Sequence, residues 1–172
     1  TTAVEAVLDV ALVQKFSVDH SIAVPLHFLT PAMDIPVIPI FISAHIPPLP
    51  PAVRCYELGR VVARAIQSWP VPWRVAVMGS GSFSLEVAGP RMAPGRPDGV
   101  PDPDWAWRAI RLMESQDIQT LIAEATPRQL FKAGNVGGEL LDWIAMLGAV
   151  GPRKPSYIAP QMQNGHAYGV WR

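Results

Sequence analysis

The sequence has almost no cysteine and no excess of charge of either sign. Among its 172 residues Cys55 is the only cysteine, which excludes an internal disulfide framework and favours a reducing compartment, so a cytoplasmic location is expected. The 14 basic and 14 acidic residues give a formal net charge of zero. We therefore expect no basic surface for nucleic acid or for an anionic membrane.

Long apolar runs are also missing. No stretch reaches the roughly 18 apolar residues of a membrane-spanning helix, and the longest, around 35–42, is interrupted by Pro36 and Pro39. No basic segment followed by an apolar one marks a secretory signal. What is present is a content of 49% hydrophobic residues, which is enough to build the core of one domain.

The apolar pattern predicts an α/β fold, with a mixed central sheet flanked by helices in a single domain. Alternating and β-branched residues predict strands over 9–18, 35–43 and 74–78. An amphipathic helix is predicted over 53–69, between the last two of these strands. The order strand, helix, strand indicates a βαβ unit with parallel pairing.

Further elements are predicted from helical spacing, capping residues and turn residues. The first residues, 1–8, have the pattern of a helix end. Proline and glycine mark a long loop over 92–102, and Thr126-Pro127 has the pattern of a helix start. The remaining predictions are a loop or short helix over 22–29, helices over 104–114 and 118–125, and one or two strands over 157–172.

Glu139 stands at the first turn of a strongly apolar helix, directly after the pair Gly137-Gly138. Because a helix N-terminus stabilises an anion, one interpretation is a glutamate favoured by the helix dipole. The other interpretation is a carboxylate that binds a metal ion. The face beside it is expected to be buried, since apolar residues recur there at helical spacing: Leu140, Leu141, Ile144 and Leu147.

The four histidines form no closely spaced metal-binding pair such as His-x-x-x-His. His20 follows a predicted strand beside Asp19, whose carboxylate would fix the tautomer of the ring, although a histidine at a strand end is commonly structural. His27 and His45 are expected to be structural. His166 precedes a predicted strand, and the sequence leaves its role open.

A loop rich in glycine and serine, 79–84, follows the strand predicted over 74–78. Ligands often bind at such strand ends in open α/β sheets. The loop is not a Walker loop, a dinucleotide fingerprint or a nucleophile elbow, because the residues and spacings of those motifs are missing. It is therefore either a weak candidate for phosphate binding or a glycine turn that presents a side chain such as Ser84 or Glu86 to a pocket.

Several segments share the order of one enzyme family: Asp9-Val10-Ala11, Val18-Asp19-His20, Val24-Pro25-Leu26, 35–41, Arg54 with Leu58-Gly59, 79–84, Gly89-Pro90-Arg91, Gly138-Glu139-Leu140 with Trp143, and Gly165-His166. In this order and spacing the chain resembles the class III extradiol ring-cleaving dioxygenases, the superfamily of the protocatechuate 4,5-dioxygenase β-subunit.

The resemblance implies a non-haem iron(II) enzyme that opens the ring of a catechol-like aromatic acid, protocatechuate-, gallate- or aminophenol-like, by extradiol cleavage with O2. Such a site holds iron through two histidines and one carboxylate. Glu139 matches the carboxylate ligand. His20 matches a histidine that contacts substrate or assists proton transfer, and Ser84 and His166 fall in segments expected to bind substrate.

The sequence departs from the family pattern at two places. The family's two iron-binding histidines lie upstream of every matched segment, so residues 1–172 are expected to be the C-terminal part of one such domain, with the N-terminal part absent, disordered or on another chain. The family's catalytic base, a histidine after the loop serine, is replaced by Leu85, which cannot move a proton. Glu86 would take over proton transfer if it faced the pocket; a solvated or structural Glu86 is the alternative.

Two other hypotheses stand beside the enzyme. Leu85 favours a non-catalytic subunit or a binding protein on the same fold, whereas the segment around Glu139 opposes it. The third is a soluble α/β domain whose matches reflect packing alone. An acidic substrate would need a cation, for which Arg91 and Arg96 are candidates, although loop arginines are commonly solvated. The expected partners are a small aromatic substrate, O2, and either copies of the same chain or a paired subunit.

Overall fold

Helices make up most of the regular structure of this chain. The computed structural model describes residues 11–15, 17–92 and 95–172. In chain order the elements are α2 (His20–Leu29), α3 (Ala52–Gln67), β1 (Glu86–Val87), β2 (Asp98–Gly99), α4 (Pro103–Ser115), α5 (Ile118–Glu124), α6 (Pro127–Lys132), the 3-10 helix η1 (Gly137–Glu139), α7 (Leu140–Val150), β3 (Tyr157–Gln161), the 3-10 helix η2 (Met162–Asn164) and β4 (His166–Val170).

Three successive helices begin at capping residues that the sequence displays. Asp102, Asp117 and Thr126 precede α4, α5 and α6, and each side chain accepts a hydrogen bond from the backbone N–H three residues later. Proline occupies the first position of α4 and α6, where its missing N–H costs nothing. The helices predicted over 104–114 and 118–125, and the one starting at Thr126-Pro127, are confirmed.

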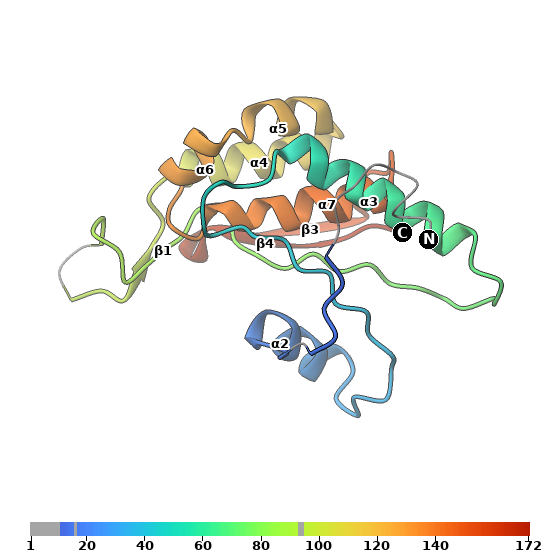
Figure 1. Ribbon diagram of the computed structural model, residues 1–172. Coiled ribbons are helices and arrows are strands. Elements are labelled where there is room, and N and C mark those ends of the chain that lie inside the picture. The colour runs from blue at the N-terminus through green and yellow to red at the C-terminus, as the bar shows by residue number, and fades with distance from the viewer. Residues whose placement is uncertain (1–10, 16, 93–94) are drawn as a thin grey trace.

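Helix α3 packs closely against α7, which with α4 supplies most of the buried core residues. A Cβ added to Gly59 of α3 would lie 1.8 Å from the Ala145 carbonyl oxygen, and one added to Gly148 of α7 would lie 2.1 Å from the Tyr56 oxygen. These glycines allow the two backbones to approach closely. In Figure 1, α4 to α6 lie on one side of α7 and the β3–β4 pair on the other.

The described residues contain two small antiparallel sheets. Glu86 of β1 lies opposite Gly99 of β2, so the loop predicted over 92–102 contains a short strand. In the second sheet the register runs from Tyr157 opposite Val170 to Gln161 opposite His166, which confirms the strands predicted over 157–172. Sheet and helices together give a mixed α and β architecture, and no central sheet is seen among the described residues.

The strands predicted over 35–43 and 74–78, and the described part of 9–18, are wrong. These segments carry no strand pairing among the described residues, and they are solvated, with Ile38 73% and Val75 50% exposed. A strand forms only beside another strand, and β propensity alone supplies no neighbour. The predicted βαβ unit is therefore wrong as well. The helix end predicted over 1–8 lies outside the described residues.

Helix α2 stands apart from the other helices (Figure 1). None of its residues is buried, and its start is fixed by Asp19, which accepts a hydrogen bond from the Ser21 backbone N–H. The choice left open for 22–29 is thus resolved as a helix. Within the described ranges no helix combines the length and the apolar character that crossing a bilayer requires.

Candidate metal centre

Glu139 lies where the loop 81–84 meets the start of α7. Its Oε2 accepts a hydrogen bond of 2.8 Å from the Ser82 backbone N–H. One turn further along α7, the indole N–H of Trp143 donates to the Gly81 carbonyl oxygen at 3.0 Å. Two hydrogen bonds therefore tie the loop to the helix that carries the carboxylate.

Gly81 permits this contact. Its φ of +152° is one that L side chains rarely adopt, and a Cβ added there would lie 2.5 Å from the Cβ of Glu139. A side chain at position 81 would push the loop away from the helix. The predicted glycine turn thus exists, and it packs against Glu139.

His45 faces the other oxygen of Glu139. Its Nε2 lies 3.6 Å from Glu139 Oε1, and its ring is about half exposed. The preceding residue, Ala44, is buried, and a Cβ added to Gly138 would lie 1.9 Å from the Ala44 carbonyl oxygen. The segment that carries His45 is therefore held against the backbone just before Glu139.

Burial dominates the electrostatics of α7's first turn. Burial raises the pKa of Glu139 above its usual value; the hydrogen bond from Ser82, His45 and His20 act in the opposite direction. Burial also raises the pKa of Asp142 to about 7, and the charge of Glu139 adds to that rise. Glu139 and Asp142 thus both lie where burial disfavours the ionised carboxylate. A bound cation nearby would stabilise the ionised form.

His20 begins α2 and lies within electrostatic reach of Glu139. Its neighbour Asp19 has a pKa below the usual value, chiefly because it accepts a hydrogen bond from the Ser21 hydroxyl. The structure therefore brings the predicted His20 and Glu139 into one region, which also contains His45.

Ser84 and Glu86 lie in a second cluster, beyond Phe83 on the same loop. The Ser84 hydroxyl is fully buried; it donates to the Ala133 carbonyl oxygen and accepts from the Asp102 N–H, both at 2.9 Å. Sequence reasoning did not place these backbone partners, because they lie far away in the chain. The hydroxyl is thus engaged on both sides by protein groups.

Glu86 forms a buried ion pair with Arg91. It is 1% exposed, its Oε2 lies 2.6 Å from Arg91 Nη2, and the Asn135 backbone N–H donates to it at 2.8 Å. Burial alone would raise its pKa, but the hydrogen bonds from Arg91 and Asn135 outweigh burial and lower the pKa. Glu86 is therefore held as an anion.

His166 lies at the start of β4, beside the same loop. The carbonyl oxygen of Gly165 accepts hydrogen bonds from the N–H groups of Phe83 and Ser84, at 2.8 and 3.1 Å. The His166 ring packs edge-on against Tyr168. The C-terminal sheet thus closes over the loop.

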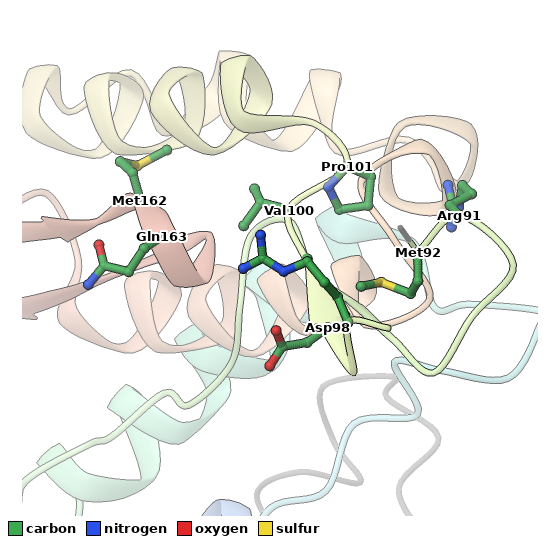
Figure 2. A pocket seen from close by; sticks show the side chains of 9 residues that line it. Arg91, Met92, Asp98, Val100, Pro101, Met162 and Gln163 are labelled. Carbon is green, nitrogen blue, oxygen red and sulfur yellow. The ribbon is translucent and has the colours of Figure 1, made fainter. Parts of the chain in front are cut away.

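An open pocket of about 410 Å³ lies next to this sheet (Figure 2). It is lined by the candidate arginines Arg91 and Arg96 together with Met162 and Gln163 of η2. Its volume is within the usual range of small-molecule sites. Arg91 already forms an ion pair with Glu86. Arg96 is the arginine of the pocket lining that lies outside this ion pair.

The donors around Glu139 fit a divalent transition metal in part. An imidazole nitrogen and a carboxylate oxygen suit iron, and the buried carboxylate gains from a nearby cation. Residues 11–15, 17–92 and 95–172 hold no group of three or more histidine, cysteine, aspartate or glutamate side chains able to bind a metal. Sequence reasoning treated His45 as structural, because only folding brings it to Glu139.

Comparison with known proteins gives relatives for nearly the whole chain. Gallate dioxygenase of Pseudomonas putida is 27% identical over 90% of this chain and 45% of its own length. The 2,3-dihydroxyphenylpropionate/2,3-dihydroxicinnamic acid 1,2-dioxygenase of Paraburkholderia xenovorans is 27% identical over 83% of this chain and 57% of its own. The chain spans about half the length of these curated relatives.

A family model extends this similarity to residues 1–170. It is described as the catalytic LigB subunit of aromatic ring-opening dioxygenase. The match includes the loop, the Glu139 helix and the C-terminal sheet. The resemblance to the class III extradiol enzymes is thereby confirmed, and the chain belongs to the LigB family of aromatic ring-opening dioxygenases.

Proposed function

We propose that this chain is part of a non-haem iron(II) dioxygenase that opens the ring of a small dihydroxylated or aminohydroxylated aromatic acid by extradiol cleavage with O2. The observation that carries the proposal is Glu139 in a chain of the LigB family. Its carboxylate is largely buried, with one oxygen anchored by the Ser82 N–H and the other facing His45. Relatives named for gallate and for 2,3-dihydroxyphenylpropionate support an aromatic acid, protocatechuate-, gallate- or aminophenol-like.

Glu139 is the proposed iron ligand through Oε1, because its Oε2 already accepts the Ser82 N–H. Bound iron would supply the redox chemistry for O2 and a docking point for the two ring hydroxyls. The cation would also stabilise the ionised carboxylate that burial disfavours. The two further histidine ligands implied by the resemblance belong to polypeptide outside the described residues.

His20 is the proposed group that contacts substrate or moves a proton. Its ring is exposed at the start of α2, and it acts on the pKa of Glu139 from there. An imidazole ring has one nitrogen that can accept a proton and one that can donate it, so His20 can both accept and return a proton during ring opening. The Asp19 carboxylate beside it is held ionised.

Ser84, Glu86 and His166 remain predictions as groups of the reaction. The contacts of Glu86 favour a positioning role, since its ion pair with Arg91 holds the loop end and keeps the carboxylate charged. Ser84 is engaged by backbone groups on both sides, so it too would act by shaping the loop. His166 is the more available candidate for substrate, because its ring is only partly buried.

Arg96 is the proposed partner of the substrate carboxylate. It lines the pocket of Figure 2, next to the sheet that carries His166. Arg91, the other candidate, is already paired with Glu86. A charged guanidinium in a pocket of this size binds a carboxylate well.

The finer fold is part of the same proposal. A mixed central sheet in one domain stays part of the proposal, and its strands would come from polypeptide outside the described residues. Residues 1–172 would then be the C-terminal part of that domain, as the partial coverage of the relatives supports. A cytoplasmic location is also proposed, supported by the buried free thiol of Cys55. Exposed apolar side chains support an enzyme that forms an oligomer or pairs with a second subunit.

A non-catalytic subunit or binding protein on the same fold is the second candidate. Leu85 favours it, because the side chain at the position of the family's base cannot transfer a proton. The backbone of Leu85 is used for packing: its carbonyl oxygen accepts the Val136 N–H at 3.0 Å. This candidate predicts a protein that binds its ligand but does not catalyse ring opening.

Oxygen uptake by the full-length gene product, loaded anaerobically with iron(II), tests the proposal. Protocatechuate, gallate and 2-aminophenol are the substrates to compare. We expect iron-dependent uptake with at least one of them, and its loss in Glu139→Ala. Glu57→Ala is the control, because Glu57 is an exposed carboxylate paired with Arg60 on α3.

Uptake that persists in Glu139→Ala would contradict the assignment of Glu139. No uptake by the iron-loaded wild type with any of the three compounds would favour the non-catalytic subunit.

A further inference from the structure

A second open pocket lies between α3 and the end of α7. Its volume is about 520 Å³, and its lining includes Arg60 and Arg64 of α3 and Arg153, which follows α7. Glu139 stands at the other end of α7, roughly 16 Å away along this helix of 11 residues. The pocket is therefore separate from the candidate metal centre, and it shares no residue with the pocket of Figure 2.

Three arginines and no acidic side chain line this second pocket. Because the whole chain has 14 basic and 14 acidic residues, the excess of positive charge is a local feature of the surface. Arg60 Nη1 lies 3.0 Å from Glu57 Oε1 in an exposed pair on α3. Among the residues that the structure describes, no hydrogen bond or ion pair engages the guanidinium groups of Arg64 and Arg153.

Backbone packing shapes the pocket. A Cβ added to Gly148 would lie 2.1 Å from the Tyr56 carbonyl oxygen, so the last turn of α7 lies directly on α3. Gly151 then turns the chain with a φ of +76°, and its carbonyl oxygen accepts the Arg153 N–H at 2.8 Å. Nothing lies within 4 Å of a Cβ added to Gly151, so the space beside this turn is open. The turn thus brings Arg153 to the pocket that α3 also lines.

The charges and the size of the pocket define its ligand. Arg60 and Arg64 are one helical turn apart, so they lie on the same face of α3. Three arginines less the one charge of Glu57 leave two positive charges. Guanidinium groups bind phosphate and carboxylate groups through paired hydrogen bonds, and the volume is within the usual range of small-molecule sites. We propose that this pocket binds a small dianion, either a phosphate monoester or a dicarboxylate.

Isothermal titration calorimetry of the full-length protein at constant ionic strength tests the proposal. Phenyl phosphate and adipate are the dianionic probes, and benzoate is the singly charged control. We expect saturable binding of one dianion per chain and weaker binding of benzoate, since benzoate pairs with fewer of the arginines. Saturation by phenyl phosphate alone identifies the ligand class as phosphate monoesters, and saturation by adipate alone identifies it as dicarboxylates.

A double variant, Arg64→Gln with Arg153→Gln, removes both guanidinium groups that lack a partner. We expect the Kd for the dianion to rise at least about tenfold, since a single exposed ion pair contributes up to about fivefold. Arg111→Gln is the matched control, because Arg111 is an exposed arginine of α4 outside the pocket, and its Kd should equal that of the wild type. Far-ultraviolet circular dichroism of each variant checks that the fold is kept.

Arg96→Gln separates this site from the pocket of the proposed function, which Arg96 lines. Loss of dianion binding in Arg96→Gln, with no change in the double variant, would place the dianion in that other pocket and overturn the proposal. Absence of saturable binding of both dianions, or an equal rise of Kd in Arg111→Gln, would overturn it as well. Oxygen uptake is not a readout here, so the dianion site and the proposed function can fail independently.

Discussion

Single residues decide how Glu139 is presented. The carboxylate is anchored on one side by the Ser82 N–H, and this bond exists because Gly81 lets the loop touch the helix. Neither feature involves a charged neighbour. The position of the candidate ligand thus depends on the backbone shape of a short loop.

Replacing Gly81 by alanine should damage both stability and metal binding. The new Cβ would meet Glu139 Cβ at 2.5 Å, in a backbone conformation unfavourable to L residues. We expect the free energy of unfolding to fall by about 1–3 kcal/mol and Mn(II) affinity to fall with it. Thermal denaturation and metal titration measure the two effects.

Gly95→Ala is the control for this change. Its φ is +80°, but nothing lies within 4 Å of an added Cβ. It should lose only the backbone contribution of about 1 kcal/mol and keep its Mn(II) affinity. Equal loss of affinity in both variants would contradict the role given to Gly81.

Asp142 should make stability depend on pH. Its pKa is raised by burial from 3.8 to about 7 in the folded protein. Between these values the folded state holds a proton that the unfolded state has released, so this residue's contribution to stability falls as the pH rises from about 4 to about 7. Denaturant unfolding at a series of pH values measures the effect.

Asp142→Asn removes this pH dependence. From about pH 4 to about pH 8 the wild type should lose about 2–4 kcal/mol more than the variant. Parallel curves for the two proteins would show that the carboxyl group ionises normally in the folded state.

Glu86→Gln should act mainly on stability. The change removes the buried charge that pairs with Arg91, so we expect a loss of about 2–3 kcal/mol. Glu57→Gln, which alters an exposed pair, should cost less than about 1 kcal/mol. Chemical denaturation compares the two variants. Unchanged stability of Glu86→Gln with lost oxygen uptake would instead support the proton-transfer role.

At the level of elements, the helices were predictable, whereas among the strands only those over 157–172 were. The starts of α4 to α6 follow from an aspartate or threonine cap, and α3 from its apolar stripe, which are local signals. The segments 35–43 and 74–78 have the composition of strands, but pairing depends on distant polypeptide. Composition therefore identified their apolar character and not their structure.

Only part of the candidate site could be predicted from the sequence. Glu139 stood out because of its place at the start of an apolar helix, and the family order pointed to His20. The partners Ser82 and His45 could not be found from the sequence, since contacts over such separations follow from folding alone. Glu86 was predicted beside the loop, but its ion pair with Arg91 was not.

The α3–α7 contact should be intolerant of added volume. In Gly59→Ala the Cβ would lie 1.8 Å from a carbonyl oxygen of α7, which cannot move without the helix. We expect a loss of more than about 2 kcal/mol in the free energy of unfolding. Gln67→Ala, at the exposed end of α3, should change it by less than about 0.5 kcal/mol. Chemical denaturation compares the two, and equal stabilities would contradict the close packing.

On the scale of the whole molecule, the described residues divide into a packed part and an open part. The packed part contains α3 to α7 with the C-terminal sheet, and Glu139 lies at its edge. The open part includes 35–41, whose apolar side chains are largely solvated. Because the chain spans about half the length of its curated relatives, partners for this surface fit the proposal of a larger enzyme.

The central claim is that Glu139 binds the metal ion of a ring-opening dioxygenase. The most direct measurement is a crystal structure of the full-length protein prepared anaerobically with iron(II), with anomalous scattering recorded at the iron edge. The account predicts an iron peak about 2.0–2.2 Å from Glu139 Oε1. An iron peak elsewhere, or none near Glu139 in crystals that contain iron, would contradict the claim.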